Sequence, residues 1–124
     1  MKKALVLVAA LMMTGSLVYA ASADKGKALF ESPTLGGGTT GKSCNTCHED
    51  GKGLGSDLFE RRQFTIMKMD KLTLADVINV CIEKPMGGAA IDPQGQEMQD
   101  VMAYMETLIK KPAPKKVRKA IEGC

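Results

Sequence analysis

The sequence predicts a small all-α domain of three to four helices. Apolar residues recur at the three- and four-residue spacing of an amphipathic helix over residues 74–82 and again over residues 98–109. No segment alternates apolar and polar side chains convincingly over the length of a strand. The chain has 124 residues and no visible internal repeat, so these helices are expected to belong to one small domain.

Residues 1–20 have the pattern of a secretory signal peptide. Lys2 and Lys3 precede an apolar run over residues 4–13, and small residues lie before a cleavage position near Ala20. The run is shorter than the about 20 residues that a membrane span needs. We therefore expect cleavage near Ala20 and export of the mature chain to the periplasm, with a retained membrane anchor as the less favoured alternative.

The first mature helix is expected over residues 24–32, because Pro33 follows closely and disfavours its continuation. Residues 35–42 are rich in glycine and are expected to form a flexible loop. This segment lacks the glycine-lysine-serine/threonine signature of a phosphate-binding loop. A second glycine-rich loop is expected over residues 49–55, whereas residues 58–69 mix charged and apolar side chains and stay unassigned.

The next helix has the clearest boundaries in the sequence. Thr73 stands three residues before Asp76, which is the spacing of an N-cap, and Lys84-Pro85 is expected to close the helix. A loop over residues 86–94 leads to the last helix. The apolar face of that helix consists of Met98, Val101, Met102, Met105, Leu108 and Ile109.

The charges are unevenly distributed along the mature chain. The domain is expected to cover residues 21–111, followed by a basic tail over residues 112–124. Six basic residues lie between Lys110 and Lys119, so the body before them is acidic. An acidic body does not suit a nucleic-acid partner. The tail is expected to be a solvated terminus, and docking on an acidic protein or an anionic membrane is the alternative.

Residues 44–48, Cys-Asn-Thr-Cys-His, fit the C-x-x-C-H pattern of covalent haem attachment. Two thiols three residues apart can reach the two vinyl groups on one edge of the porphyrin, and the adjacent histidine supplies a nitrogen ligand to iron. The motif thus predicts one haem c held by Cys44, Cys47 and His48. Two other readings are weaker: a thioredoxin-like motif expects a βαβ context, and a structural zinc site expects four ligands, usually from two such clusters.

His48 is the only histidine of the chain, so ligation of the iron by two histidines of one chain is excluded. The second axial ligand is then a methionine, a cysteine, a lysine, the N-terminal amine or water, or that position stays open. Most methionines are expected to fill the core, and Met67 and Met69 are undecided. Met86 lies between proline and glycine in a loop, where its sulfur could reach a ring face.

The order of a short N-terminal helix, an early CxxCH motif, a loop and a C-terminal amphipathic helix resembles small class I cytochromes c over residues 24–110. Gly26, Phe30 and Tyr104 look like the contact between the first and last helices of that family. The resemblance implies a fold wrapped around one haem, Met86 as the iron ligand, and a one-electron carrier between redox proteins rather than an enzyme.

A weaker resemblance concerns the segment from Ile78 to Met86, followed by Glu97-Met98 and Ala103-Tyr104. These residues look like the haem domains of thiosulfate dehydrogenases and related sulfur-oxidising cytochromes. Some of these use a cysteine ligand, so the alternative is a haem subunit or enzyme of sulfur-compound oxidation with Cys81 at the iron. The chain departs from them in having a single CxxCH, and Lys84 where an arginine is common. A Cys81–Cys124 disulfide or an inert thiol is the plainer expectation for Cys81.

Class I members often carry a proline whose backbone carbonyl orients the iron-binding histidine. Residues 54–58, where that proline would be expected, contain none. The group that orients His48 is therefore unassigned from the sequence.

Overall fold

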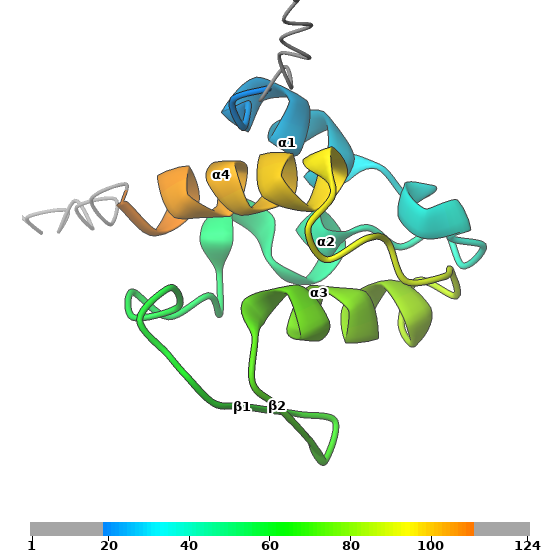
Figure 1. The fold of residues 1–124 in the computed structure, drawn as a ribbon. Helices are drawn as coiled ribbons and strands as arrows, with labels where there is room; N and C mark the ends of the chain where they lie inside the picture. The colour runs from blue at the N-terminus through cyan, green and yellow to red at the C-terminus, as the bar shows by residue number, and fades with distance from the viewer. Residues whose placement is uncertain (1–18, 111–124) are drawn as a thin grey trace, which may run out of the picture.

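The computed structural model describes residues 19–110, which form four α-helices and one two-stranded antiparallel sheet (Figure 1). In chain order the elements are α1 (Ala23–Glu31), the 3₁₀ turn η1 (Leu35–Gly37), α2 (Cys44–Cys47), the 3₁₀ turn η2 (Glu49–Gly51), β1 (Phe64–Ile66), β2 (Met69–Lys71), α3 (Leu74–Glu83) and α4 (Gln96–Lys110). The helix-rich architecture predicted from the sequence is confirmed for this part of the chain. The predicted signal peptide and basic tail lie almost entirely outside the described residues.

Helices α1 and α4 pack closely against each other (Figure 1). Gly26 allows this approach, because a Cβ atom there would collide with the backbone carbonyl of Asp100 on α4. Next to it, the rings of Phe30 and Tyr104 meet edge to face with their centroids 5.4 Å apart, a favourable aromatic geometry. The predicted contact between these three positions is therefore confirmed.

The start of α1 is tied to α4 by a buried carboxylate. Asp100 is 3% exposed, and its Oδ1 accepts hydrogen bonds from the backbone N–H of Ser22 at 2.7 Å and from Gln96 Nε2 at 2.8 Å. Ser22 also caps α1, since its hydroxyl oxygen accepts a hydrogen bond from the N–H of Lys25. The buried side chain of Asp100 thus has hydrogen-bond partners, as buried polar groups do in folded proteins.

Helix α3 begins and ends where its sequence signals predict. The hydroxyl oxygen of Thr73 accepts a hydrogen bond from the N–H of Asp76 at 3.1 Å, and Lys84 closes the helix with a bond from its N–H to the carbonyl of Val80. The buried side chain of Asn79 forms two hydrogen bonds of 2.9 Å with the backbone of Ile91. This pair attaches the loop between α3 and α4 to α3.

The sheet is a hairpin in the segment that the sequence left unassigned. Phe64 pairs with Lys71 and Ile66 with Met69, and the two turn residues after Ile66 have positive φ angles of 51° and 65°, as a tight hairpin turn requires. Strands of three residues are too short to show alternation, which explains why the all-α prediction omitted them. The hairpin lies at the end of the molecule opposite α1 (Figure 1).

The core is one cluster formed by residues of α1, α3, α4, β1 and the loops, and the partly buried Cys44 of α2 packs against it. Met98 and Met105 are buried in it, and Met102 packs against it, so the expectation that these methionines fill the core is confirmed. No helix within residues 19–110 is both long and apolar enough to cross a membrane.

Candidate functional site

A cavity of about 460 Å³ lies beside this core, within the range of about 300–1,000 Å³ typical of cofactor sites. Its walls are mainly apolar and come from α1, α2, α3, α4, β1 and the loops between them. The residues predicted for the site all line it, namely Cys44, Cys47, His48, Met86 and the alternative ligand Cys81. The C-x-x-C-H residues and the two candidate ligands that follow them by 33 to 42 positions are therefore brought to one cavity.

Helix α2 holds the first three of these residues. It is a single helical turn in which the N–H of Ser43 donates a hydrogen bond to Thr46 Oγ1 at 2.9 Å, and the N–H of His48 donates to the carbonyl of Cys44 at 2.9 Å. Thr46 is one of the two variable positions of the C-x-x-C-H motif, and here it caps the turn. The turn places Cys44, Cys47 and His48 on the cavity wall.

The ring of His48 is oriented by the backbone of Lys52. His48 Nδ1 lies 2.9 Å from the Lys52 carbonyl oxygen; a carbonyl only accepts, so the Nδ1–H donates and the lone pair of Nε2 is left for a metal. Lys52 lies between Gly51 and Gly53, whose φ angles of 81° and 78° favour glycine. The sequence analysis missed this contact, although the two glycines around Lys52 marked a sharp bend.

Burial raises the pKa of two thiols on the cavity wall, Cys44 and Cys81. Burial raises the pKa of Cys44 to about 11, with a further increase from the nearby Cys81. The pKa of Cys81 is also raised, first by burial and then by the charge of Cys47. Both thiols are therefore protonated at neutral pH, and neither has the lowered pKa of a catalytic thiolate.

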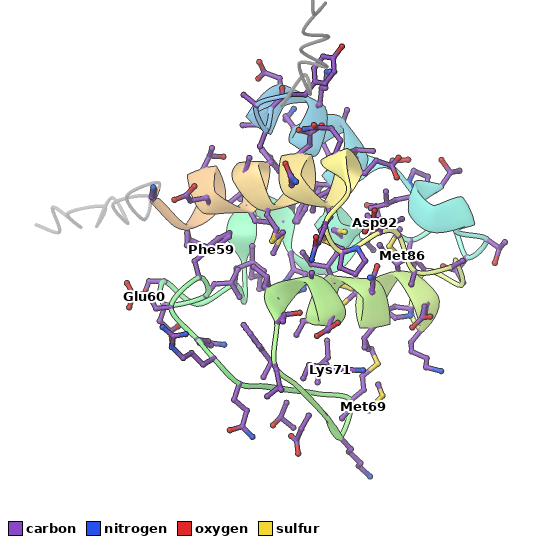
Figure 2. All side chains as sticks on the ribbon, in the orientation of Figure 1. Phe59, Glu60, Met69, Lys71, Met86 and Asp92 are labelled. Carbon is purple, nitrogen blue, oxygen red and sulfur yellow. The ribbon has the colours of Figure 1, made fainter. Side chains whose placement is uncertain are left out.

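Met86 is 2% exposed and lies three residues after the end of α3 (Figure 2). Its N–H donates a hydrogen bond to the carbonyl of Cys81 at 3.3 Å, so the two candidate iron ligands are neighbours on the same cavity. Met67 and Met69 lie on the hairpin and do not line the cavity. Figure 2 shows Met69 well apart from Met86, which removes these two methionines as ligands in this arrangement.

The polar part of the cavity wall includes Lys42, Arg61 and Gln63. The guanidinium of Arg61 is paired with Asp57 through Nε at 2.8 Å and a terminal nitrogen at 2.6 Å. The pairing lowers the pKa of Asp57, chiefly through these hydrogen bonds. Nothing in the local sequence identified Arg61 as a cavity residue, because it lies in the segment that showed no periodicity.

Two other readings of the cysteines can be compared with the structure. Within residues 19–110 no group of three or more histidine, cysteine or acidic side chains is arranged to hold a metal ion. In the same range Cys44, Cys47 and Cys81 form no disulfide with one another. Cys124, the expected disulfide partner of Cys81, lies outside the described residues.

Comparison of the chain with protein-family models, with curated proteins and with solved structures gives no significant match. The interpretation of the site therefore depends on its own residues and geometry.

Proposed function

We propose that the chain is an exported c-type cytochrome with one haem, and that it carries one electron at a time between redox protein partners. The observation that carries this proposal is that both thiols and the imidazole of the C-x-x-C-H turn line the same apolar cavity as Met86. In this proposal residues 21–111 form a class I-like cytochrome domain. The signal peptide directs it to the periplasm and is cleaved near Ala20.

The residues of the cavity fit a covalently bound haem. Cys44 and Cys47 would hold it through thioether bonds, and His48 would bind iron through Nε2 because Lys52 fixes the proton on Nδ1. Lys42 offers positive charge at the cavity wall to the two carboxylates of the porphyrin, whereas the guanidinium of Arg61 is already paired with Asp57. When bound, the haem supplies a one-electron iron couple.

The surroundings favour transport of an electron over catalysis. Among the described residues, every buried side-chain nitrogen or oxygen has a hydrogen-bond partner, so none is held unpaired for use by a substrate. Burial raises the pKa of Cys81, the thiol that is not used for attachment, so it does not have the lowered pKa of a catalytic thiolate. Fixed, fully paired surroundings limit reorganisation around a redox centre, which suits a carrier.

A second function is supported by one observation, the position of Cys81 on the same cavity as the C-x-x-C-H turn. With Cys81 as the iron ligand, the chain would be a haem subunit or enzyme of sulfur-compound oxidation. Met86 is favoured over Cys81 because it is almost fully buried and lies in a loop, whereas Cys81 is fixed within α3.

The test is the optical spectrum of the full-length protein, produced in a host that attaches haem. A thioether-ligated ferric haem has a weak charge-transfer band in the near infrared, and we expect this band in the native protein and in Cys81→Ala but not in Met86→Ala. If the native protein lacks the band and only Cys81→Ala changes the spectrum, Cys81 is the ligand, and the proposal of a sulfur-oxidation subunit or enzyme replaces that of an electron carrier. Carbon monoxide binding to the native reduced protein would instead indicate an open iron position.

A further inference from the structure

The glycine-rich segment before α2 contacts the loop that carries Met86. The backbone N–H groups of Thr39 and Thr40 both donate to the Met86 carbonyl, at 2.9 and 3.2 Å. The hydroxyl of Thr40 donates to the Pro85 carbonyl at 2.8 Å, and the hydroxyl of Thr39 donates to the Gly87 carbonyl at 3.1 Å. Two adjacent threonines thus bind three consecutive carbonyls, with Met86 at the centre.

The two segments also fit closely on either side of this contact. The N–H of Ala89 donates a hydrogen bond to the Gly36 carbonyl at 2.7 Å. A Cβ atom on Gly87 would lie 2.8 Å from Thr39 Oγ1, and one on Gly88 would lie 2.8 Å from the Gly36 carbonyl oxygen. Any larger residue at these glycines would separate the segments, so this close contact requires glycine at both positions.

The hydrogen bonds hold the backbone from which the Met86 side chain extends. Its carbonyl is held by the threonines, while its thioether side chain is buried and lines the cavity. The hydroxyl bonds themselves are exposed, so water can replace them when they are removed. Their loss is therefore expected to free the loop rather than to unfold the domain.

We propose that Thr39 and Thr40 are positioning residues that keep the Met86 thioether at the iron. This inference rests on the proposed function with Met86 as ligand. A thioether is a neutral ligand whose contact with the iron depends on how firmly its loop is held, in the same way that outer-shell hydrogen bonds hold other metal ligands. Cys81 lies within α3, before the loop, so ligation by Cys81 would not depend on the threonines.

The experiment compares the haem-loaded Thr39→Val/Thr40→Val protein with the native protein. The variant keeps both backbone N–H groups and loses both hydroxyls. We expect a weaker near-infrared thioether band and binding of added imidazole to the ferric protein about tenfold tighter, as the loss of two hydrogen bonds implies. Far-ultraviolet circular dichroism and haem content should equal those of the native protein. Each single variant should give about a threefold change, so a double variant that fails to fold does not prevent the test.

Two controls separate positioning from general damage. Thr39→Ser/Thr40→Ser keeps the hydroxyls and should behave like the native protein. Thr34→Val removes a hydroxyl whose side-chain contact is with Ser32 on the same exposed stretch, and it should leave imidazole affinity unchanged. Equal imidazole affinity in the valine double variant and in Thr34→Val would overturn the proposal.

The result for the native protein distinguishes this inference from the proposed function. A thioether band that is the same in all threonine variants overturns the positioning role and leaves the carrier intact. A covalent haem without a thioether band in the native protein overturns Met86 ligation and the positioning role together. A chain that takes up no covalent haem overturns the proposed function itself.

Discussion

The C-x-x-C-H turn and the Met86 loop line the same cavity but are held in different ways. The turn is fixed by hydrogen bonds between residues three or four positions apart, such as Ser43 with Thr46 and His48 with Lys52. The loop is fixed by bonds to Thr39 and Thr40, which lie 48 and 45 positions away from their partners, respectively. The conformation of the turn can therefore be predicted from a short motif. The conformation of the Met86 loop depends on contacts that form only when the chain folds.

The largest effect is expected from Met86→Ala, which should change the iron ligand of the loop without changing haem attachment at the turn. Met86→Ala should abolish the near-infrared thioether band and lower the reduction potential by roughly 0.1 V or more, because axial ligands set haem potentials over about 0.8 V. Haem content should not change, since attachment depends on the local turn. Met67→Ala is the matched control, because Met67 is exposed on the hairpin. A loss of covalent haem in Met86→Ala would contradict the independence of the two regions.

A glycine substitution tests how closely the loop is packed. Gly87→Ala places a Cβ atom 2.8 Å from Thr39 Oγ1 at a φ of 66°, and it should lower the free energy of unfolding by about 1–3 kcal/mol. Gly37→Ala introduces a similar φ strain at 76° but meets no atom within 4 Å, so its loss should be smaller. Guanidinium unfolding of the loaded proteins measures both. Equal losses of unfolding free energy in the two variants would show that the close contact between the two segments does not contribute to stability.

A smaller effect is expected at the turn. Thr46→Val removes the acceptor of the Ser43 N–H bond and should cost about 0.5–1.5 kcal/mol of unfolding free energy. Haem attachment and the thioether band should persist, because the thiols and His48 stay on the same helical turn. The neighbouring Asn45→Ala serves as the control. A variant that loses the thioether band while keeping its haem would show that the turn also controls the Met86 side.

The smallest effect concerns Cys81 and its dependence on pH. Burial raises its pKa above the ordinary value, and only the thiolate reacts with iodoacetamide. Alkylation of Cys81 in the native loaded protein should therefore be several-fold slower near pH 8 than in the urea-unfolded chain, and it should accelerate as the pH rises. Peptide mapping by mass spectrometry follows Cys81 alone. Equal rates in the native and unfolded protein would contradict its placement on the cavity wall.

The sequence was informative wherever the signal was local. Periodicity predicted α3 and α4, capping predicted the start of α3, and Pro33 predicted the end of α1. The spacing of Cys44, Cys47 and His48 predicted residues that share one cavity. The hairpin was missed because its strands have three residues each. The hydrogen bonds from Thr39 and Thr40 to the Met86 loop could not be predicted, because they join segments far apart in the chain. The place of Arg61 on the cavity wall could not be predicted because its segment shows no periodicity. The contact between His48 and Lys52 could be predicted in part. The glycines on either side of Lys52 indicated a bend, but not that the Lys52 carbonyl accepts a hydrogen bond from His48.

The central claim is tested most directly by the intact mass of the full-length protein, purified from a host that attaches haem to exported proteins. We expect the native chain to carry the mass of one haem after denaturation and to have lost residues 1–20. The Cys44→Ala/Cys47→Ala variant should carry no covalent haem, whereas Cys81→Ala should carry one. A native protein whose denatured mass equals that of the polypeptide alone would contradict the account.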